Sequence, residues 1–454
     1  MNLLFKYSNS LLKYLVGACL LAIPLYAKFP FITVPGTFVA IRLEDFLLSI
    51  TGLVFIFASY GFWKSLLKER IVQSVIVYLS IGLVSLLSAL FVTKSVGGLI
   101  GLLHWVRRIE YLLPLFVGWY VVSRDKSALS FYFKIILVVI GTSFLYGWGQ
   151  KHLSWPIIIT QNQEYSKGVA LRWIPGSHIN ATFAGHYDLA SFLVFVLPII
   201  IPSVFVLKGK MTKLILTIIS VSGLWLLANA MSRISLASYV MAVTMALIFI
   251  KKYKPIIPVI IVSVVVFGMS STVIDRYSRI YDVLVSQVQK MTSTVSLDTY
   301  GAEITPPPDP KIEDQQPSPQ PEDRSSSIRL NVEWPRAIRA LSKNPLLGTG
   351  YSSITLATDN DYLRALGETG VLGFLSFGLI FVNIVVVYLK KLPFIKTYKS
   401  LRLVFVVGTI TGLMGTFVNA VFIDIFEASK FAILFWFMIG FTMAIMKPLR
   451  ATDE

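Results

Sequence analysis

The amino-acid sequence predicts an all-α, polytopic membrane protein with about twelve transmembrane helices and one large extracytoplasmic loop. Of the 454 residues, 55% are hydrophobic and only 14% are charged, whereas a soluble domain usually carries about 25% charged residues. The apolar residues form long unbroken runs, and a run of about 18 or more can cross the hydrocarbon core as a helix. These observations exclude an ordinary soluble protein.

The apolar runs define the predicted spans, and the basic residues between them define the topology. The spans are 12–27, 41–63, 71–93, 101–122, 129–149, 187–207, 212–230, 234–250, 255–271, 370–389, 402–422 and 429–446. Lysine and arginine gather in alternate loops, as in 64–70, 124–126, 208–213, 251–254 and 390–402. Short loops with such an excess lie in the cytoplasm, so both termini are predicted to be cytoplasmic. This topology explains much of the net charge of +17 without a nucleic-acid partner.

Two longer segments interrupt this pattern, and both are predicted on the outer face. The first is 150–186, within a membrane domain that covers 1–271 and spans one to nine; the second is 272–369, followed by a membrane domain of three spans at 370–454. Residues 301–327 are rich in Pro, Gln and acidic residues, so we expect a flexible linker there. The flanks 271–291 and 329–341 have helical spacing of apolar residues, with Pro335 in a first turn or at a kink.

Charged residues at membrane depth or at its outer edge are costly and are the first candidates for function. Arg107, Arg108 and Glu110 fall in the fourth span, where a simple Glu–Arg pair is the alternative interpretation. Arg233 opens the eighth span on a face whose short loops avoid arginine, although it could equally be a solvated anchor.

The first outer loop carries a second candidate group. Arg172 is followed by His178, His186 and Asp188, just before the sixth span. No two histidines have the spacing of a helical metal pair, so neither a metal site nor a cofactor is predicted. Asp188 could simply cap the following helix.

The densest group lies in the second outer loop. On a helix over 329–341, Trp334, Ile338 and Leu341 share a face that can pack on the membrane domain. That arrangement leaves the arginines available for an anion, since guanidinium groups bind phosphate oxygens in bidentate fashion. They are Arg329, Arg336 and Arg339.

A glycine turn and a cluster of carboxylates follow this helix. Gly348 and Gly350 would let the backbone approach a neighbour closely. Asp359, Asn360 or Asp361 would N-cap the helix that runs into the tenth span, which is the structural explanation for any one of them.

Together these segments resemble the O-antigen ligase/polymerase superfamily of bacterial polytopic membrane glycosyltransferases, the O-antigen ligase-like membrane proteins. Its members show an Arg…Trp…Ala stretch, a Pro-Leu-Leu-Gly-x-Gly turn and a His-Asn-x-x-Leu…Glu-x-Gly stretch in the large outer loop. The matching residues here are Arg329, Trp334 and Ala337, then 345–350, then 359–363 with Glu368 and Gly370. The segment 182–190 and the pair Ser232-Arg233 resemble further signatures. Asp359 stands where ligases of this family commonly have a histidine that is proposed as the catalytic base.

The resemblance implies glycan transfer from a polyprenyl (undecaprenyl) diphosphate carrier to an acceptor hydroxyl. The enzyme would be a metal-independent, inverting glycosyltransferase without cofactor, acting on the outer face of the bacterial plasma membrane. The implied diphosphate ligands are Arg233 and Arg329, with Arg172 and Arg336 as second choices, and the candidate bases are Asp359, Asp361 and Glu368. A ligase and a polymerase would use the same donor. The alternatives are a lipid-linked glycan flippase or transporter, whose long loop would more often be central and cytoplasmic, and a structural membrane partner.

Overall fold

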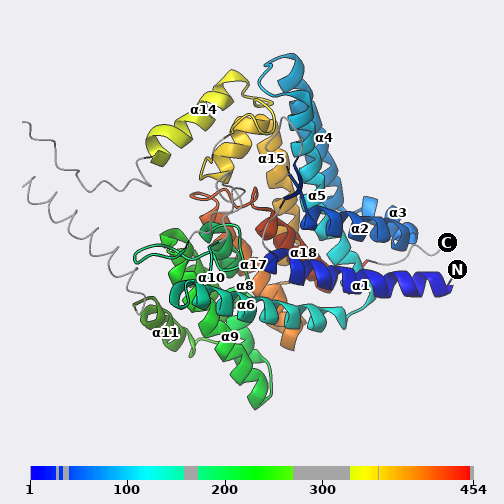
Figure 1. Ribbon diagram of the computed structural model, residues 1–454. Coiled ribbons are helices and arrows are strands. Elements are labelled where there is room, and N and C mark those ends of the chain that lie inside the picture. The colour runs from blue at the N-terminus through cyan, green and yellow to red at the C-terminus, as the bar shows by residue number, and fades with distance from the viewer. Residues whose placement is uncertain are drawn as a thin grey trace, which may run out of the picture.

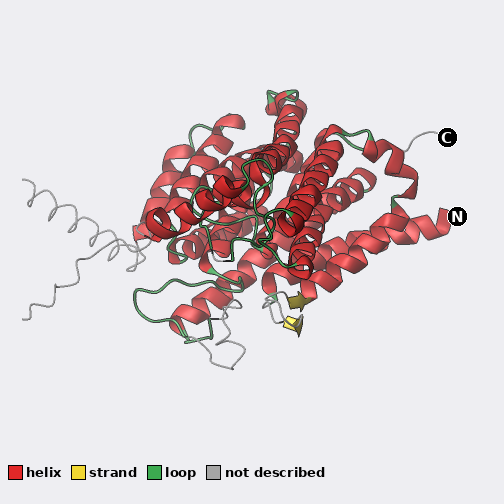
Figure 2. Ribbon diagram, turned by 90° about the horizontal axis from the view of Figure 1, so that it is seen from above, coloured by secondary structure: helices red, strands yellow, loops and turns green. Residues whose placement is uncertain are grey.

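The computed structural model describes residues 2–26, 30–33, 40–157, 172–268, 328–355 and 357–449. Apart from a hairpin of β1 (Pro30–Thr33) and β2 (Ala40–Arg42), these residues form helices and their connections (Figure 2). The predicted linker at 301–327 and the predicted helical segment at 271–291 both lie outside this part of the chain.

The helices follow the order of the predicted spans. The first part of the chain forms α1 (Asn2–Leu25), α2 (Leu43–Ala58), η1 (Tyr60–Phe62), α3 (Trp63–Leu67), α4 (Arg70–Phe91), α5 (Gly98–Arg124) and α6 (Ala128–His152). The middle part forms α8 (His186–Val206), α9 (Lys210–Asn229), α10 (Arg233–Phe249) and α11 (Ile256–Gly268). The last part forms η2 (Arg329–Glu333), α14 (Trp334–Lys343), α15 (Asp361–Leu389), α16 (Phe394–Thr397), α17 (Ser400–Asn419) and α18 (Ser429–Met446).

Eight of the described helices are long and apolar enough to cross a membrane, and the bent pair of α2 with η1 and α3 would make a ninth. This is the pattern of a multi-pass membrane protein, but it supports the prediction of about twelve spans only in part. Helices also lie at the other predicted positions. However, α5 carries Arg107, Arg108 and Glu110 in its middle, and α10 and α11 have 17 and 13 residues.

The centre of the helical body is formed by α8, α17 and α18 (Figure 1). In the most apolar stretch of α18, 94% of the residues are buried inside the protein. Glycines let this helix lie against α5: a Cβ on Gly440 would come within 2.3 Å of the Leu115 carbonyl oxygen, and one on Gly118 within 2.9 Å of the Phe437 carbonyl oxygen. Small residues allow such close helix packing where water supplies no hydrophobic driving force.

Contacts between the helix ends fall into two groups, which agree with the two faces predicted from loop charge. On one side, Lys13 pairs with Asp125 at 2.7 Å. Nearby, two residues of α5 contact the first part of α1 and the residue that follows α18. The Tyr120 hydroxyl donates to Asn9 Oδ1, and Trp119 Nε1 donates to the Lys447 carbonyl.

The second group joins loops that the topology places on the outer face. Ser95 Oγ donates to the Thr349 carbonyl at 2.6 Å. The buried ammonium of Lys430 donates to the carbonyls of Tyr26 and Thr182 at 2.7 and 2.6 Å. The loops between α4 and α5, between α6 and α8, and between α14 and α15 therefore lie on one side of the body.

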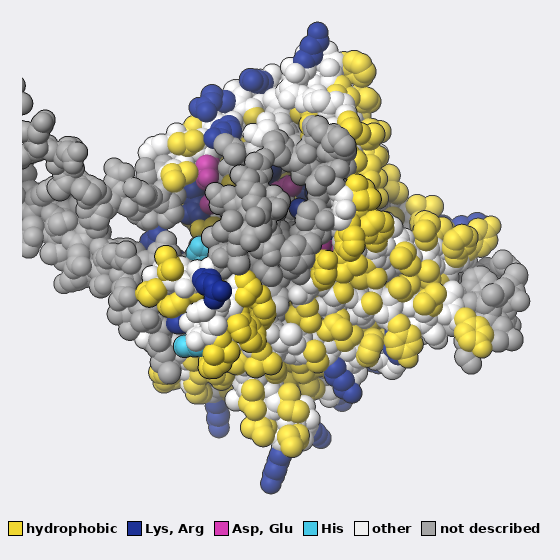
Figure 3. All heavy atoms as spheres, in the orientation of Figure 1, with side chains coloured by type: hydrophobic (Ala, Val, Ile, Leu, Met, Phe, Trp, Pro, Cys, Tyr) yellow, Lys and Arg dark blue, Asp and Glu magenta, His cyan; other side chains and the backbone are white. Residues whose placement is uncertain are grey.

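The surface carries apolar side chains where a bilayer would surround it. Phe57 of α2 and Phe91 of α4 are each 74% exposed, and Ile218 of α9 is 54% exposed. Figure 3 shows such side chains covering the right-hand side of the view, over α4 and α2, with lysine and arginine at the top and bottom ends. Large exposed apolar patches of this kind mark a surface that faces lipid or a partner.

We predict that Gly440→Leu lowers the thermal unfolding temperature of the detergent-purified protein, because the new side chain would collide with the α5 backbone. Overpacking a tight core costs typically about 1–3 kcal/mol. Gly378→Leu in α15 is the matched control, since a Cβ there meets nothing within 4 Å. Equal melting temperatures for the two variants would contradict the close approach of α5 and α18.

Candidate functional site

The structure brings Arg329 and Asp359 together as an ion pair. Nε and Nη2 of Arg329 both donate to Oδ2 of Asp359, at 3.0 and 2.7 Å. Nη2 also donates to the hydroxyl of Tyr187 in the first turn of α8, at 3.1 Å. The side chains of Arg329 and Asp359 are only 14% and 21% exposed. A charged pair shielded from most solvent therefore lies where η2, α8 and the turn before α15 meet.

Local sequence explains how this pair is presented. The π-helical turn η2 leads into α14, with Pro335 in the first turn of that helix, as one of the two predictions for this proline has it. Asp359 has a φ of +48°, a left-handed conformation that Asp adopts more readily than most residues. Asn360 then N-caps α15, its Oδ1 accepting the Leu363 N–H at 2.9 Å. The predicted capping is confirmed for Asn360.

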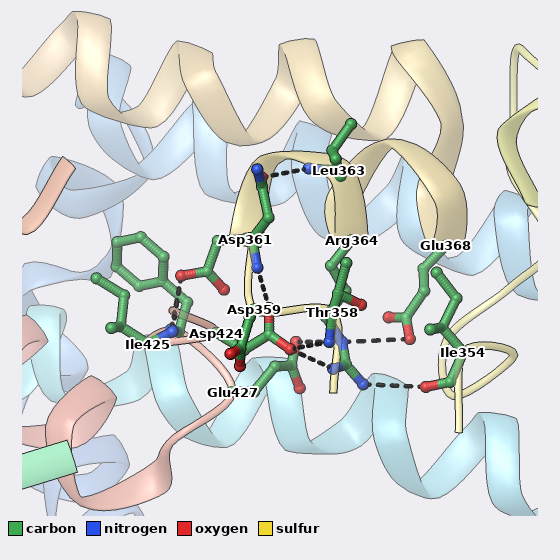
Figure 4. Close-up of polar contacts among 12 residues, drawn as sticks. Ile354, Thr358, Asp359, Asp361, Leu363, Arg364, Glu368, Asp424, Ile425 and Glu427 are labelled. Atoms are coloured by element: carbon green, nitrogen blue, oxygen red, sulfur yellow. Dashed lines mark hydrogen bonds and ion pairs between the residues drawn. The ribbon is translucent and has the colours of Figure 1, made fainter. Parts of the chain in front are cut away.

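Asp424, in the turn between α17 and α18, holds the backbone on both sides of Asp359. Its carboxylate accepts the N–H of Thr358 at 2.7 Å and that of Asn360 at 2.9 Å, and it accepts from Nη1 of Arg364 at 2.9 Å. Figure 4 shows these contacts meeting at one carboxylate. The sequence prediction missed Asp424, although an acidic residue in a short outer loop between two spans was a usable signal.

The two other predicted bases have different surroundings. Oδ2 of Asp361 accepts the N–H groups of Ile425 and Phe426, at 2.8 and 3.2 Å. Oε1 of Glu368, a residue 2% exposed, lies 3.5 Å from Nε of Arg364. The contacts of Asp361 hold the first turn of α15 against the turn between α17 and α18, whereas that of Glu368 lies within α15. Both favour a structural role for these carboxylates.

A second ion pair lines a small cavity beside this network. Arg108 of α5 donates to Glu427, not to the nearby Glu110 that the sequence offered as its simplest partner. Burial would raise the pKa of Glu427, but Arg108 and Arg364 outweigh it and lower that pKa to about 2. The cavity, lined in part by Arg108, Arg364 and Glu427, measures about 50 Å³. It has room for a few waters but not for a sugar or a diphosphate.

The glycine turn of residues 344–350 packs as predicted. Gly348 and Gly350 have φ values of +67° and +89°. A Cβ on Gly348 would lie 2.4 Å from the backbone of Glu368, and one on Gly350 would lie 2.3 Å from the Cβ of Ala89. The prediction for the face of α14 was partly wrong: Ile338 is 52% exposed, and the fully buried residue is Ala337, beside Gly367.

The predicted arginines are not all gathered at the ion pair. Arg233 is the half-buried first residue of α10. Two residues later, Ser235 accepts from Nδ2 of Asn419 at 3.0 Å, so the start of α10 lies beside the end of α17. Arg336 lies on α14, close to Arg329 in the chain. Arg172 is exposed and donates to the Ser154 carbonyl at 2.9 Å, within its own loop.

The histidines of the first outer loop lie next to Tyr187. The rings of His178 and His186 stack at 3.7 Å, and His186 lies 4.0 Å from the Tyr187 ring. Across the described residues, no three His, Cys, Asp or Glu side chains are arranged to hold a metal ion. Asp188 does not cap α8 as suggested: the N-cap is Gly185, and Asp188 is buried in the first turn.

Tyr187 and Lys430 are two further residues that sequence reasoning missed. Tyr187 had no distinguishing pattern, because a tyrosine at the start of a span is common at membrane interfaces. Lys430, in contrast, lies at the start of an otherwise apolar predicted span and is fully buried. Its position alone marked it as a residue that needed partners.

One comparison with known proteins bears on this site. Residues 216–378 match the family model described as O-antigen ligase. The match runs from α9 into α15 and includes Arg233, Arg329 and Asp359. No curated protein matches the chain.

We predict that Asp424→Ala destabilises the protein strongly, because it removes one partner of Arg364 and leaves two backbone N–H groups without their acceptor. Breaking a buried pair from one side costs about 3–5 kcal/mol, measured here as a lower thermal unfolding temperature in detergent. Asp125→Ala is the control, since Asp125 also pairs with a cation but is 43% exposed, and such pairs contribute about 1 kcal/mol or less. A small effect at both positions would show that Asp424 does not organise the turn.

Proposed function

Because this chain carries a domain of the O-antigen ligase family over residues 216–378, we propose that it transfers a glycan from a polyprenyl diphosphate carrier to an acceptor hydroxyl. The observation that carries the proposal is the shielded Arg329–Asp359 pair inside the matched range. It combines a phosphate-binding cation with a carboxylate that can accept a proton, on the side of the body that the loop charges assign to the outside.

Arg329 is the principal ligand for the leaving diphosphate. Negative charge gathers on that group as the glycosidic bond breaks, and fixed cations in a site with little water stabilise it far better than cations in bulk solvent. The hydrogen bonds to Asp359 and Tyr187 use Nε and Nη2, and Nη1 has no partner among the described residues. Arg233 completes the diphosphate site, with Arg336 and Arg172 as second choices.

Asp359 is the proton acceptor that these contacts favour among the three predicted carboxylates. Burial raises its pKa above the usual range, although Arg329 opposes that shift, and a more basic carboxylate is a better general base. When the diphosphate binds the guanidinium of Arg329, it replaces Asp359 as the partner of that group. Asp359 can then accept a proton from the acceptor hydroxyl. The hydroxyl oxygen then attacks the anomeric carbon, its proton passes to Asp359, and the diphosphate leaves with inversion.

The proposed topology has all twelve predicted spans in the membrane, with α5, α10 and α11 among them. The charged residues of α5 support this, because Arg108 is paired with Glu427 inside the protein and faces no lipid. Both termini are then cytoplasmic, and the loop of residues 272–369 carries the site on the extracytoplasmic face of the plasma membrane.

We predict that Arg329→Ala and Arg233→Ala each reduce glycan transfer at least about 100-fold, the usual effect of removing a fixed group that stabilises transition-state charge. The assay uses proteoliposomes with a lipid-linked oligosaccharide. Arg339→Ala, which removes an exposed arginine of α14, is the matched control and should retain activity. Normal product from both site variants would refute the diphosphate assignment.

The products of the same assay separate the candidate activities. Lengthened carrier-linked chains identify a polymerase, and a glycan on a new acceptor identifies a ligase. Carrier translocation without any new glycosidic bond would refute transfer and establish a flippase.

The topology has its own test, because Cys19 is buried and is the single cysteine. With Lys94→Cys, a membrane-impermeant maleimide should label intact spheroplasts; with Lys391→Cys, it should label only inverted vesicles. The opposite pattern would reverse the proposed orientation.

A further inference from the structure

Two consecutive residues at the start of α14 each have a buried polar atom without a partner. Oε2 of Glu333 and Nε1 of Trp334 are both shielded from solvent, and neither makes a hydrogen bond within the part of the chain that the structure describes. Folded proteins rarely leave buried polar atoms unsatisfied, so each such atom needs an explanation. Neither residue has a role in the transfer proposed above.

Both side chains face the surroundings of the Arg329–Asp359 pair. The Trp334 ring lies 6.1 Å from the ring of Phe422, two residues before Asp424. The charged groups acting on Glu333 are Asp359 before α15, Asp424 between α17 and α18, and Arg329 and Arg336 on its own helical segment. The two unsatisfied atoms are therefore close to the place where the diphosphate would bind.

The pair of atoms selects a particular kind of ligand. A carboxylate oxygen requires a donor and an indole N–H requires an acceptor, and hydroxyl groups supply both. A phosphate would satisfy Trp334 but would be repelled by Glu333. A cation would satisfy Glu333 but not Trp334.

We propose that Glu333 and Trp334 form a sugar-binding subsite, in which hydroxyls of the glycan donate to Oε2 of Glu333 and accept from Nε1 of Trp334. The inference rests on the proposed function, since it takes the substrate to be a glycan whose diphosphate lies at Arg329. Arg336, whose Nη1 is also buried without a described partner, stays available to the phosphate end of the donor.

The subsite has a pH dependence of definite sign. Burial, with a further contribution from Asp359, raises the pKa of Glu333 to about 7, although Arg329 and Arg336 oppose the shift. The carboxylate is therefore protonated as the pH falls through about 7, and Oε2 then loses acceptor strength. Sugar binding should weaken below pH 7, and Glu333→Gln should abolish that part of the pH dependence.

The test measures binding of three probes to the full-length protein in nanodiscs. They are undecaprenyl diphosphate alone, the same carrier bearing the cell's oligosaccharide, and that oligosaccharide released from its carrier. Trp334→Phe keeps a ring but removes the N–H, and loss of one hydrogen bond should weaken binding of a sugar-containing probe about 3- to 10-fold. Arg339→Gln, on the exposed face of α14, is the control.

The outcomes separate the possible sources of the sugar. Loss confined to the glycosylated carrier places the donor sugar at the subsite, and loss confined to the released oligosaccharide places the acceptor sugar there. Unchanged binding of both sugar probes by Trp334→Phe and Glu333→Gln overturns the proposal, as does equal loss with the bare carrier. The proposed function fails separately, if Arg329→Ala binds the bare carrier normally.

Discussion

A charge buried in a helical membrane protein must be paired, and this constraint shapes the outer end of α15. Arg364 lies among Asp424, Glu368 and Glu427, and Glu427 in turn pairs with Arg108 of α5. Such networks add little net stability, because desolvation offsets most of the attraction, but removing one member is costly. The consequence here is geometric. Asp424 fixes the backbone on both sides of Asp359, so the carboxylate that meets Arg329 is presented by a rigid turn.

Local pattern was sufficient to predict the elements that make up this region. Apolar runs and basic loops located most of the spans, the Asn360 cap followed from residue type, and the close-packed turn followed from Gly348 and Gly350. Asp424 was missed, however, because its contacts form only if the turn between α17 and α18 lies next to the start of α15. Hydropathy does not encode that adjacency. It indicates which segments lie in the membrane and which face of a helix is apolar, but it does not indicate which helices pack together. The exposure of Ile338 has the same cause, since the helical repeat gives the apolar face of α14 but not how much of it another element covers.

The same reasoning explains why three predicted carboxylates looked equivalent in the sequence and differ in the structure. Asp359, Asp361 and Glu368 all precede or open one helix, so spacing alone cannot rank them. Their partners do. Asp361 accepts hydrogen bonds from two backbone N–H groups, and Glu368 lies beside Arg364 in the interior. Of the three, only Asp359 pairs with an arginine from a different outer segment, Arg329. A bound anion can replace Asp359 as the partner of that arginine.

Hydrogen-bond partners therefore divide the polar groups of the outer region into two sets. Asp424, Asp361 and Lys430 form hydrogen bonds with backbone groups near helix ends. Irregular backbone near a bilayer needs such partners, because little water is available to it. These groups build the site. Glu333 and Trp334 have buried atoms that the described protein leaves unsatisfied, next to the Arg329–Asp359 pair. Buried polar atoms without a partner are uncommon in folded proteins. In the proposed subsite, hydroxyl groups of the substrate satisfy the carboxylate of Glu333 and the indole N–H of Trp334.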